Sequence, residues 1–230
     1  MNFLLVKMSG KGERFNSQTP KQFADVNGHP LFYCLLDQYR QAGFIDGYFL
    51  VTNPEWIDYV KTVSFQLLGN KVLGVIPGGD TMSKSIYNGI MYSRDYVSDE
   101  DILLIHDVTN PIVDIDKIPE VISVSKQYGF CVLGTEQVHT IYRIDQDNNI
   151  EAVIPRQEVS SGYSPEGFVF KNIYNCYTNA NESELECMTS AIALAKAHGV
   201  TAKIVKSHIP NLKITYKEDL EIFKRITKEV

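Results

Sequence analysis

The sequence predicts an α/β fold built on one doubly wound, mostly parallel sheet with helices on both faces. Short apolar runs of strand length alternate with segments of helical period almost from one end of the chain to the other. Neighbouring parallel strands need a crossover between them, and this alternation supplies it. No internal repeat, low-complexity tract or Pro/Gly/Ser-rich linker interrupts the pattern. We therefore expect residues 1–230 to form a single domain.

The expected strands are short apolar runs, as found where a strand is buried on both faces of a parallel sheet. They are rich in the branched and aromatic residues that favour strands. They cover Phe3–Val6, Tyr48–Thr52, Val72–Ile76, Ile102–Ile105, Phe130–Gly134 and Ala202–Val205.

Start and stop signals mark the helices between these strands. Pro30 can occupy the first turn of a helix that ends at Gly43. Its apolar face would carry Leu31, Leu35 and Leu36. Further start signals are Asn53-Pro54-Glu55, Ser83 before Ile86, Tyr87, Ile90 and Met91, and the capping boxes Ser183-x-x-Glu186 and Thr215-x-x-Glu218.

One region breaks the alternation and predicts a projecting β-hairpin arm at about residues 138–160. Two short strand patterns, residues 140–144 and 150–154, flank the polar turn Asp145-Gln146-Asp147-Asn148-Asn149. An arm with apolar alternation needs a surface to pack against. We therefore expect a homodimer formed through this arm.

Composition and net charge limit the classes of function that the chain can have. Hydrophobic residues make up 44% of the chain and charged residues 22%, which is ordinary globular composition. A formal net charge of -6 argues against a protein that coats nucleic acid, but not against a small anionic ligand. No apolar run reaches the ~20 residues that span a bilayer, and the N-terminal run is too short for a signal peptide. The four cysteines, Cys34, Cys131, Cys176 and Cys187, lack the spacing of a metal site and are expected to be reduced thiols. We therefore expect a cytoplasmic protein that does not associate with membranes.

A glycine-rich loop follows the first strand, in the sequence Ser9-Gly10-Lys11-Gly12-Glu13-Arg14. Glycines at the carboxyl end of a strand let backbone N–H groups approach phosphate oxygens closely. Phe15 stands where a dinucleotide fingerprint needs its third glycine, and the Gly-Lys-Ser/Thr of a Walker A loop is absent. Arg14 and Lys21 flank the loop and suit a triphosphate. A plain turn between strand and helix remains the alternative.

A second glycine-rich turn, Gly78-Gly79-Asp80, precedes Ser85 on the next helix. The backbone of Gly79 and the side chains of Asp80 and Ser85 could read the edge of a base. An ordinary turn between strand and helix is the alternative.

Two further segments carry candidate chemistry. Asp107 ends a strand, where a carboxylate can hold Mg²⁺ together with phosphate oxygens and water; capping of a turn is its alternative. The adjacent His106 is expected to be a packed histidine rather than a base. Lys213 lies in the segment Asn211–Thr215 before the last helix, and alone it would be taken for a solvated lysine.

Taken together, these motifs resemble the methylerythritol-phosphate and ribitol-phosphate cytidylyltransferase family over essentially the whole chain. The most specific parts are Pro20-Lys21-Gln22-Phe23 after Gly-x-Gly-x-Arg, and Asn211–Thr215 with Glu218-Asp219-Leu220. Ser164-Pro165-Glu166-Gly167-Phe168 looks like the family's Thr-Pro-Gln-Gly/Phe segment. The resemblance implies a Rossmann-like fold of the nucleotide-diphospho-sugar transferase type.

The resemblance also implies a role for each candidate residue. The nucleotide-binding residues would be Met8, Ser9, Gly10, Gly12, Gly79, Asp80 and Ser85. Arg14, Lys21 and Lys213 would surround the α-phosphate of CTP as catalytic residues, and Asp107 would hold Mg²⁺. Asn110, Thr140, Arg156 and Ser164 would bind the acceptor, some of them reaching across the dimer.

Three positions depart from the family pattern. Lys7 precedes the first loop, Asn110 replaces the Arg of His-Asp-x-x-Arg-Pro, and Met82 replaces an Arg that is common after Gly-Gly-Asp-x. Because Asn cannot supply the charge or the fork geometry of Arg, methylerythritol 4-phosphate is expected to be a poor acceptor. Arg156 would then carry most of the acceptor's charge recognition. If methylerythritol phosphate were used after all, Lys7 or Lys84 would have to supply the missing charge.

The predicted activity is the transfer of CMP from CTP to a polyol phosphate, such as ribitol 5-phosphate, with release of pyrophosphate. Three alternatives remain open at this stage. They are a methylerythritol 4-phosphate cytidylyltransferase, a dinucleotide-dependent oxidoreductase and a nucleotide-binding protein without catalysis.

Overall fold

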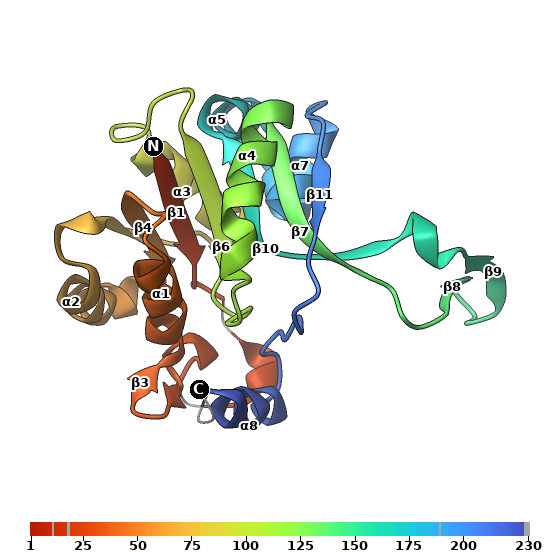
Figure 1. Cartoon of the computed structure of the whole chain (residues 1–230), viewed down its shortest axis with the longest axis horizontal. Coiled ribbons are helices and arrows are strands. Elements are labelled where there is room, and N and C mark those ends of the chain that lie inside the picture. Colours follow the sequence, from red (N-terminus) through yellow and green to blue (C-terminus); the bar gives the residue numbers. More distant parts are fainter. Residues whose placement is uncertain (11, 18, 189, 228–230) are drawn as a thin grey trace.

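The computed structural model describes residues 1–10, 12–17, 19–188 and 190–227, and its centre is a seven-stranded sheet (Figure 1). The strands lie in the order β11-β7-β10-β6-β1-β4-β5, and β10 alone among them runs antiparallel to its neighbours. Their bounds are β1 Asn2–Lys7, β4 Gly47–Thr52, β5 Val72–Pro77, β6 Ile102–Asp107, β7 Phe130–Glu136, β10 Ser160–Val169 and β11 Lys203–Lys206. The predicted doubly wound, mostly parallel sheet is thus confirmed.

Strand β10 was not predicted from the sequence, because Ser, Gly and Pro break its apolar pattern. It forms because it pairs with β6 on one side and with β7 on the other. The register with β7 shifts between Tyr163 and Glu166, where Ser164 and Pro165 lie. A proline, which has no backbone N–H to donate, is tolerated in a sheet at such an irregularity.

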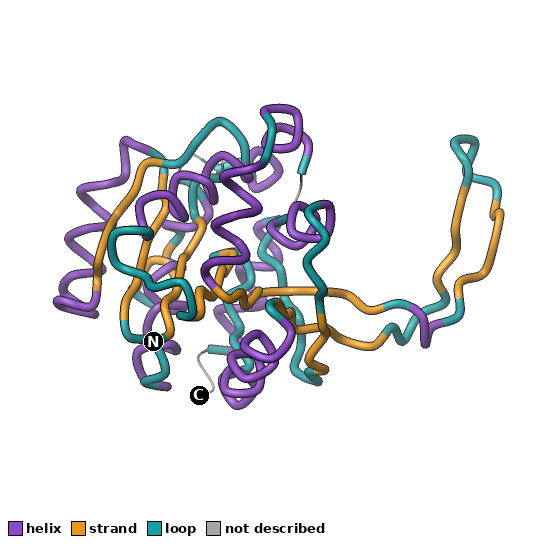
Figure 2. Tube along the Cα trace, turned by 90° about the horizontal axis from the view of Figure 1, so that it is seen from above, coloured by secondary structure: helices purple, strands orange, loops and turns teal. Residues whose placement is uncertain are grey.

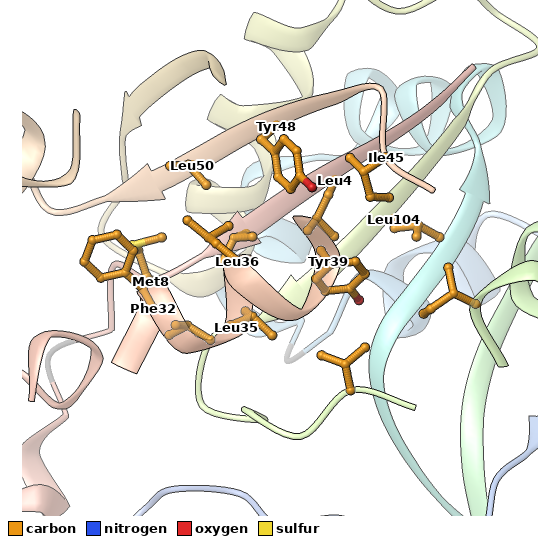
Figure 3. Packing of buried hydrophobic residues seen from close by; sticks show 14 of the residues in the cluster. Leu4, Met8, Phe32, Leu35, Leu36, Tyr39, Ile45, Tyr48, Leu50 and Leu104 are labelled. Atoms are coloured by element: carbon orange, nitrogen blue, oxygen red, sulfur yellow. The ribbon is translucent and has the colours of Figure 1, made fainter. Parts of the chain in front are cut away.

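Helices cover both faces of the sheet (Figure 1). They are α1 Leu31–Ala42, α2 Ile57–Leu68, α3 Met82–Ser93, α4 Ile118–Tyr128, α5 Phe170–Asn179, α6 Glu182–Cys187, α7 Ala191–Ala197 and α8 Lys217–Ile226. Alternate residues of β1 point to opposite faces. Leu4 and Val6 pack with α1, α2 and α4, whereas Phe3 and Leu5 pack with α3, α5 and α7. Figure 3 shows the first of these two cores, with Leu35 and Leu36 of α1 against the sheet.

Two predicted capping boxes are shifted along the chain. Helix α6 begins at Glu182, so its cap is Asn181, which exchanges hydrogen bonds with Glu184; the predicted Ser183 and Glu186 lie inside the helix. At α8, the carboxylate of Asp219 accepts hydrogen bonds from the backbone N–H groups of Thr215 and Tyr216, both at 2.8 Å. Helix α8 is therefore capped by Asp219 instead of the predicted Glu218.

Helix α8 lies at the end of the molecule toward which β1 points (Figure 1). It packs through Leu220 and Phe223 on a small apolar cluster that includes Phe15, Leu31 and Ile214. This cluster joins the loop after β1 to the segment before α8. Two candidate regions that are about 200 residues apart in sequence are thereby brought together.

The predicted arm projects far from the sheet (Figures 1 and 2). Strands β8 Ile141–Ile144 and β9 Ile150–Ile154 pair in antiparallel fashion. Apolar side chains on the arm face solvent in the single chain; Ile150 and Val153 are 61% and 63% exposed. A short antiparallel ribbon, β2 Asp25–Val26 and β3 His29–Pro30, lies at the start of α1. None of the helices in the described ranges is long and apolar enough to cross a bilayer.

His106 of β6 is fully buried and has a structural role, as expected from the sequence. Its Nε2 lies 2.8 Å from the carbonyl oxygen of Asn110, which can only accept, so Nε2 carries the proton. Nδ1 therefore accepts a hydrogen bond from the hydroxyl of Tyr39, also at 2.8 Å. Burial lowers the pKa of His106 to about 4, which keeps the ring neutral.

Replacing Tyr39 by Phe should lower the free energy of unfolding by about 1–3 kcal/mol, because the buried Nδ1 of His106 would lose its donor. Urea denaturation of the wild-type chain and of Tyr39→Phe measures the difference. Tyr59→Phe, at a side chain 40% exposed, is the control and should stay within about 0.5 kcal/mol of wild type. Equal losses in the two variants would show that the buried hydrogen bond does not stabilise the fold.

Candidate active site

A cleft of about 1000 Å³ opens at the carboxyl ends of β1, β4, β5 and β6. This is the edge at which open α/β sheets bind their ligands. The predicted residues that line the cleft are Met8, Ser9, Gly10, Gly12, Arg14, Lys21, Gly79, Asp80, Ser85, Asp107 and Lys213. The fold thus collects all four segments that the sequence singled out.

The glycine-rich loop after β1 is held in shape by Gln22. The Gln22 amide, only 1% exposed, donates hydrogen bonds to the carbonyl oxygens of Met8 at 2.7 Å and of Gly10 at 3.1 Å. The N–H of Met8 also bonds to the carbonyl of Val51 at 2.8 Å. The N–H of Met8 and one lone pair of its carbonyl oxygen are therefore used within the chain, while Met8 also lines the cleft, so its contact with the nucleotide stays a prediction. Gly12 has a φ of 64°, where a glycine is strongly favoured.

Gln22 is a site residue that sequence reasoning missed as an individual position. Its signal was present, because it lies within the Pro-Lys-Gln-Phe motif. What the motif could not reveal is which carbonyl groups the amide would reach.

Ser85 on α3 forms hydrogen bonds with both glycine-rich loops. Its Oγ accepts a hydrogen bond from the N–H of Gly79 at 3.0 Å, contacts Ser9 Oγ at 2.8 Å and lies 2.9 Å from the carbonyl of Thr81. A Cβ at Gly78 would come within 2.5 Å of the Ser9 Cβ, so the loops can approach this closely only with glycine there. Ser85 therefore sets the spacing of the loops, and exposed Asp80 stands at the rim of the cleft.

Asp107, the last residue of β6, is the most densely contacted acid of the cleft. Its Oδ1 accepts hydrogen bonds from the N–H and the hydroxyl of Thr109, at 3.0 and 2.7 Å. Its Oδ2 faces two ammonium groups, Lys7 Nζ at 3.7 Å and Lys213 Nζ at 3.5 Å. Its backbone N–H donates to Ser164 Oγ at 2.9 Å.

These contacts keep the Asp107 carboxylate charged. Burial alone would raise its pKa, but Lys7, Lys213 and the hydrogen bonds from Thr109 together lower the pKa of Asp107 to about 2. Glu166, on the neighbouring strand β10, responds in the opposite way. Burial and the charge of Asp107 raise the pKa of Glu166 to about 7, although Lys7 and Lys213 oppose the shift.

Lys21 links the loop after β1 to the segment that carries Lys213. Its Nζ donates to the carbonyl oxygen of Ile214 at 2.8 Å, and the N–H of Ile214 donates to the carbonyl of Thr109 at 2.7 Å. Burial lowers the pKa of Lys21, which Asp107 partly offsets. Lys213 itself is 56% exposed on its side chain, and Arg14 is exposed beside it on the cleft wall.

Comparisons with known proteins decide the family. The sequence profile of the 2-C-methyl-D-erythritol 4-phosphate cytidylyltransferase family, IspD, matches residues 3–229. The chain belongs to this family. It is 30% identical over 230 residues to a ribitol-5-phosphate cytidylyltransferase of Vibrio parahaemolyticus, covering 98% of this chain and 95% of the relative. It is 29% identical to a 2-C-methyl-D-erythritol 4-phosphate cytidylyltransferase of Clostridium novyi, covering 100% and 97%.

Solved structures share the IspD fold. The 4-diphosphocytidyl-2C-methyl-D-erythritol synthase of Anaerococcus prevotii superposes with a TM-score of 0.80 at 21% identity, over 100% of this chain and 96% of that one. The 2-C-methyl-D-erythritol 4-phosphate cytidylyltransferase of Francisella tularensis gives a TM-score of 0.79 at 20% identity, over 97% and 98%. At these identities the likeness establishes the fold.

Asn110 does not occupy the place predicted for it. It is 5% exposed and lies outside the cleft lining. Its side-chain amide donates to Asn211 Oδ1 at 3.2 Å and points toward the carbonyl of Leu212 at 3.5 Å. The prediction that Asn110 binds the acceptor is therefore corrected: the residue anchors the segment that carries Lys213.

The other predicted acceptor residues separate into two groups. Ser164 is 7% exposed and accepts the hydrogen bond from Asp107 N–H, so it positions the end of β6. Thr140 and Arg156 are exposed on the arm, where an Arg156 guanidinium nitrogen donates to the carbonyl of Val138 at 3.0 Å. The arm projects away from the central sheet (Figure 1). Neither Thr140 nor Arg156 lines the cleft of its own chain.

The donor set of the cleft fits a Mg²⁺ ion only if phosphates share its coordination. No group of three or more His, Cys, Asp or Glu side chains with metal-site geometry occurs within residues 1–10, 12–17, 19–188 and 190–227. Asp107 Oδ2 accepts no hydrogen bond from the described residues, so it is available as one ligand. Mg²⁺ commonly combines one or two carboxylates with substrate phosphates and water. Asp107 would hold the ion, and the flanking Lys7 and Lys213 disfavour a free dication there.

The buried position of Asn110 predicts that an arginine there destabilises the fold instead of supplying a charge to the acceptor. Asn110→Arg should place a charge in a 5% exposed site and break the contacts to Asn211, at a cost of about 3 kcal/mol or more in unfolding free energy. Chemical denaturation measures the loss. Asn175→Arg, on the exposed face of α5, is the matched control and should change little. A stable, more active Asn110→Arg variant would contradict the buried role.

Proposed function

We propose that this chain transfers CMP from CTP to the phosphate of a polyol phosphate and releases pyrophosphate. The observation that carries the proposal is the cleft itself. In a chain of the IspD family, the cleft combines two glycine-rich loops on one side with a partly buried carboxylate flanked by lysines on the other. Family membership favours this activity over a dinucleotide-dependent oxidoreductase. The glycine-rich loops would take the nucleotide, with the N–H groups of the first loop near its phosphates.

The reaction needs positioning and charge stabilisation and no protein nucleophile. An oxygen of the acceptor phosphate attacks the α-phosphorus of CTP, and the bond to the β-phosphate oxygen breaks. Arg14, Lys21 and Lys213 would neutralise the charge that develops on the α-phosphate. Mg²⁺ on Asp107 would add positive charge to the nucleotide phosphates. The hydrogen bond between Lys21 and the carbonyl of Ile214 supports this assignment, because it keeps both lysines at one end of the cleft.

The acceptor class follows from the relatives. Two of them are named for ribitol 5-phosphate and 2-C-methyl-D-erythritol 4-phosphate, both phosphorylated polyols. We propose a ribitol-phosphate-like acceptor, the class for which the Vibrio parahaemolyticus relative at 30% identity over 98% of this chain is named; a methylerythritol-phosphate relative of Clostridium botulinum is 31% identical over 95% of it. Methylerythritol phosphate is the second candidate, favoured by the family profile.

Pyrophosphate release from CTP with a panel of phosphorylated polyols tests the proposal. The panel contains ribitol 5-phosphate, glycerol 3-phosphate, methylerythritol 4-phosphate and free ribitol. We expect release with one polyol phosphate, preferentially ribitol 5-phosphate, and none with free ribitol. CTP binding without pyrophosphate release across a broad panel would instead indicate a nucleotide-binding protein without catalysis.

Removing the charged groups of the cleft should affect turnover more than binding. Asp107→Ala should abolish measurable turnover while circular dichroism stays unchanged. Lys21→Ala and Lys213→Ala should lower kcat by about 10²–10³ and change KM less, because one preorganised charge contact contributes about 3–4 kcal/mol in the transition state. Steady-state kinetics separate the two parameters. Full activity of Lys213→Ala would return this residue to the role of a solvated lysine.

We also propose that the chain is a homodimer in which the arm of one subunit reaches the cleft of the other. The exposed apolar side chains of the arm, and the absence of Thr140 and Arg156 from the lining of their own cleft, support this arrangement. Deleting Arg143–Val153 and closing the gap with Gly-Ser should give a monomer with little activity. Sedimentation velocity and the pyrophosphate assay measure both properties. A fully active monomer would contradict the shared site.

A further inference from the structure

Lys7 occupies an unusual place for a lysine, at the carboxyl end of β1 inside the sheet. In register it pairs with Asp107 of β6, and its side chain is only 13% exposed. It lies on the face of the sheet that carries α3, α5 and α7, because alternate residues of β1 share a face and Phe3 and Leu5 pack there. It also lines the cleft. Ordering and partly burying a lysine costs side-chain entropy and hydration, so its retention needs a compensating interaction.

The described residues give the Lys7 ammonium weak partners. Its hydrogen bond within residues 1–10, 12–17, 19–188 and 190–227 goes to the thioether sulfur of Met82 at 3.0 Å, and thioether sulfur is a weak acceptor. Asp107 Oδ2, at 3.7 Å, attracts its charge but lies beyond hydrogen-bond distance. An ammonium has three donors. Lys7 therefore keeps donor capacity for a bound anion.

Lys84 contrasts with Lys7 as a candidate cation. Its Nζ pairs with Glu182 and Glu186 of α6, and it does not line the cleft. Of the two lysines considered from the sequence as substitutes for a missing arginine, the structure therefore leaves only Lys7 free to face a ligand.

The charged groups near Lys7 indicate which kind of ligand it would bind. The acids near Lys7 are Asp107, which lines the cleft, and Glu166 of β10, which lies outside the cleft lining. Glu166 forms no ion pair within 4 Å among the described residues. Beneath these acids lies the buried hydroxyl of Tyr177, which is neutral. A phosphate entering the cleft on this side would meet the Asp107 carboxylate, and the Glu166 carboxyl group lies in the same electrostatic neighbourhood. Lys7 and Lys213 are the cations that oppose them, and Lys213 is largely exposed.

We propose that Lys7 binds the phosphate of the acceptor and thereby selects a phosphate monoester as the attacking group. The inference rests on the proposed function and extends it to a residue of β1. Arg14 and Lys21 approach from the loop after β1 and would serve the nucleotide, whereas Lys7 stands between the nucleotide loops and Asp107. Its charge would offset the repulsion between the acceptor phosphate and the α-phosphate as they come together.

Lys7→Met tests the inference, because methionine keeps most of the length of the side chain and removes its charge. We expect KM for the preferred polyol phosphate to rise by about 10- to 100-fold, the effect of losing one hydrogen bond to a charged group. The Kd for CTP, measured by calorimetry without acceptor, should change less than about threefold. Lys7→Arg should recover part of the loss. Lys117→Met, at a side chain 36% exposed just before α4, is the control and should behave as wild type.

A second readout does not require turnover. Binding of inorganic phosphate to the CTP-bound protein, measured by calorimetry, should be weaker in Lys7→Met than in wild type by a similar factor. Equal loss of CTP and phosphate affinity would overturn the proposal, since Lys7 would then be a nucleotide contact. Unchanged phosphate affinity would also overturn it and leave Lys7 as a counter-ion of Asp107. If wild type released no pyrophosphate with any acceptor, the proposed function would fail, while the phosphate titration would still decide the role of Lys7.

Discussion

The carboxylate of Asp107 is the charge around which the rest of the cleft is arranged. One oxygen is held by Thr109 and the other faces Lys7 and Lys213, while Ser164 fixes its backbone. A buried carboxylate is costly unless it is paired and hydrogen-bonded, so these partners must all be in place when the chain folds. They come from β1, β6, β10 and the segment before α8. The environment of Asp107 is therefore complete only when the sheet has formed and the segment before α8 lies against it.

Two side-chain amides connect the loops of the site to the sheet. Gln22 closes the loop after β1 over its own carbonyl groups, and Asn110 ties the segment before α8 to the end of β6. Lys21 then joins the loop and the segment through the carbonyl of Ile214. Hydrogen bonds to backbone groups hold the two segments that carry Lys21 and Lys213. The two ammonium groups, which repel each other, are therefore kept at the same end of the cleft by these hydrogen bonds.

Much of this organisation could be predicted from sequence, because it is local or periodic. The apolar runs gave the parallel strands, and the glycine-rich motifs marked the cleft. Strand β10 could not be predicted, since pairing with β6 and β7 overrides its poor strand propensity. The role of Asn110 was misjudged for a related reason. A motif identifies a position, but only the packed structure shows whether its polar groups face the ligand or a neighbouring carbonyl.

The fate of the acceptor's oxygen atoms tests the central claim most directly. The acceptor is prepared with ¹⁸O in its phosphate group, and the CDP-linked product is examined by ³¹P nuclear magnetic resonance. If the acceptor phosphate attacks the α-phosphorus of CTP, the oxygen that bridges the two phosphorus atoms of the product carries ¹⁸O and shifts both resonances. An unlabelled bridging oxygen, or label appearing in pyrophosphate, would contradict the account.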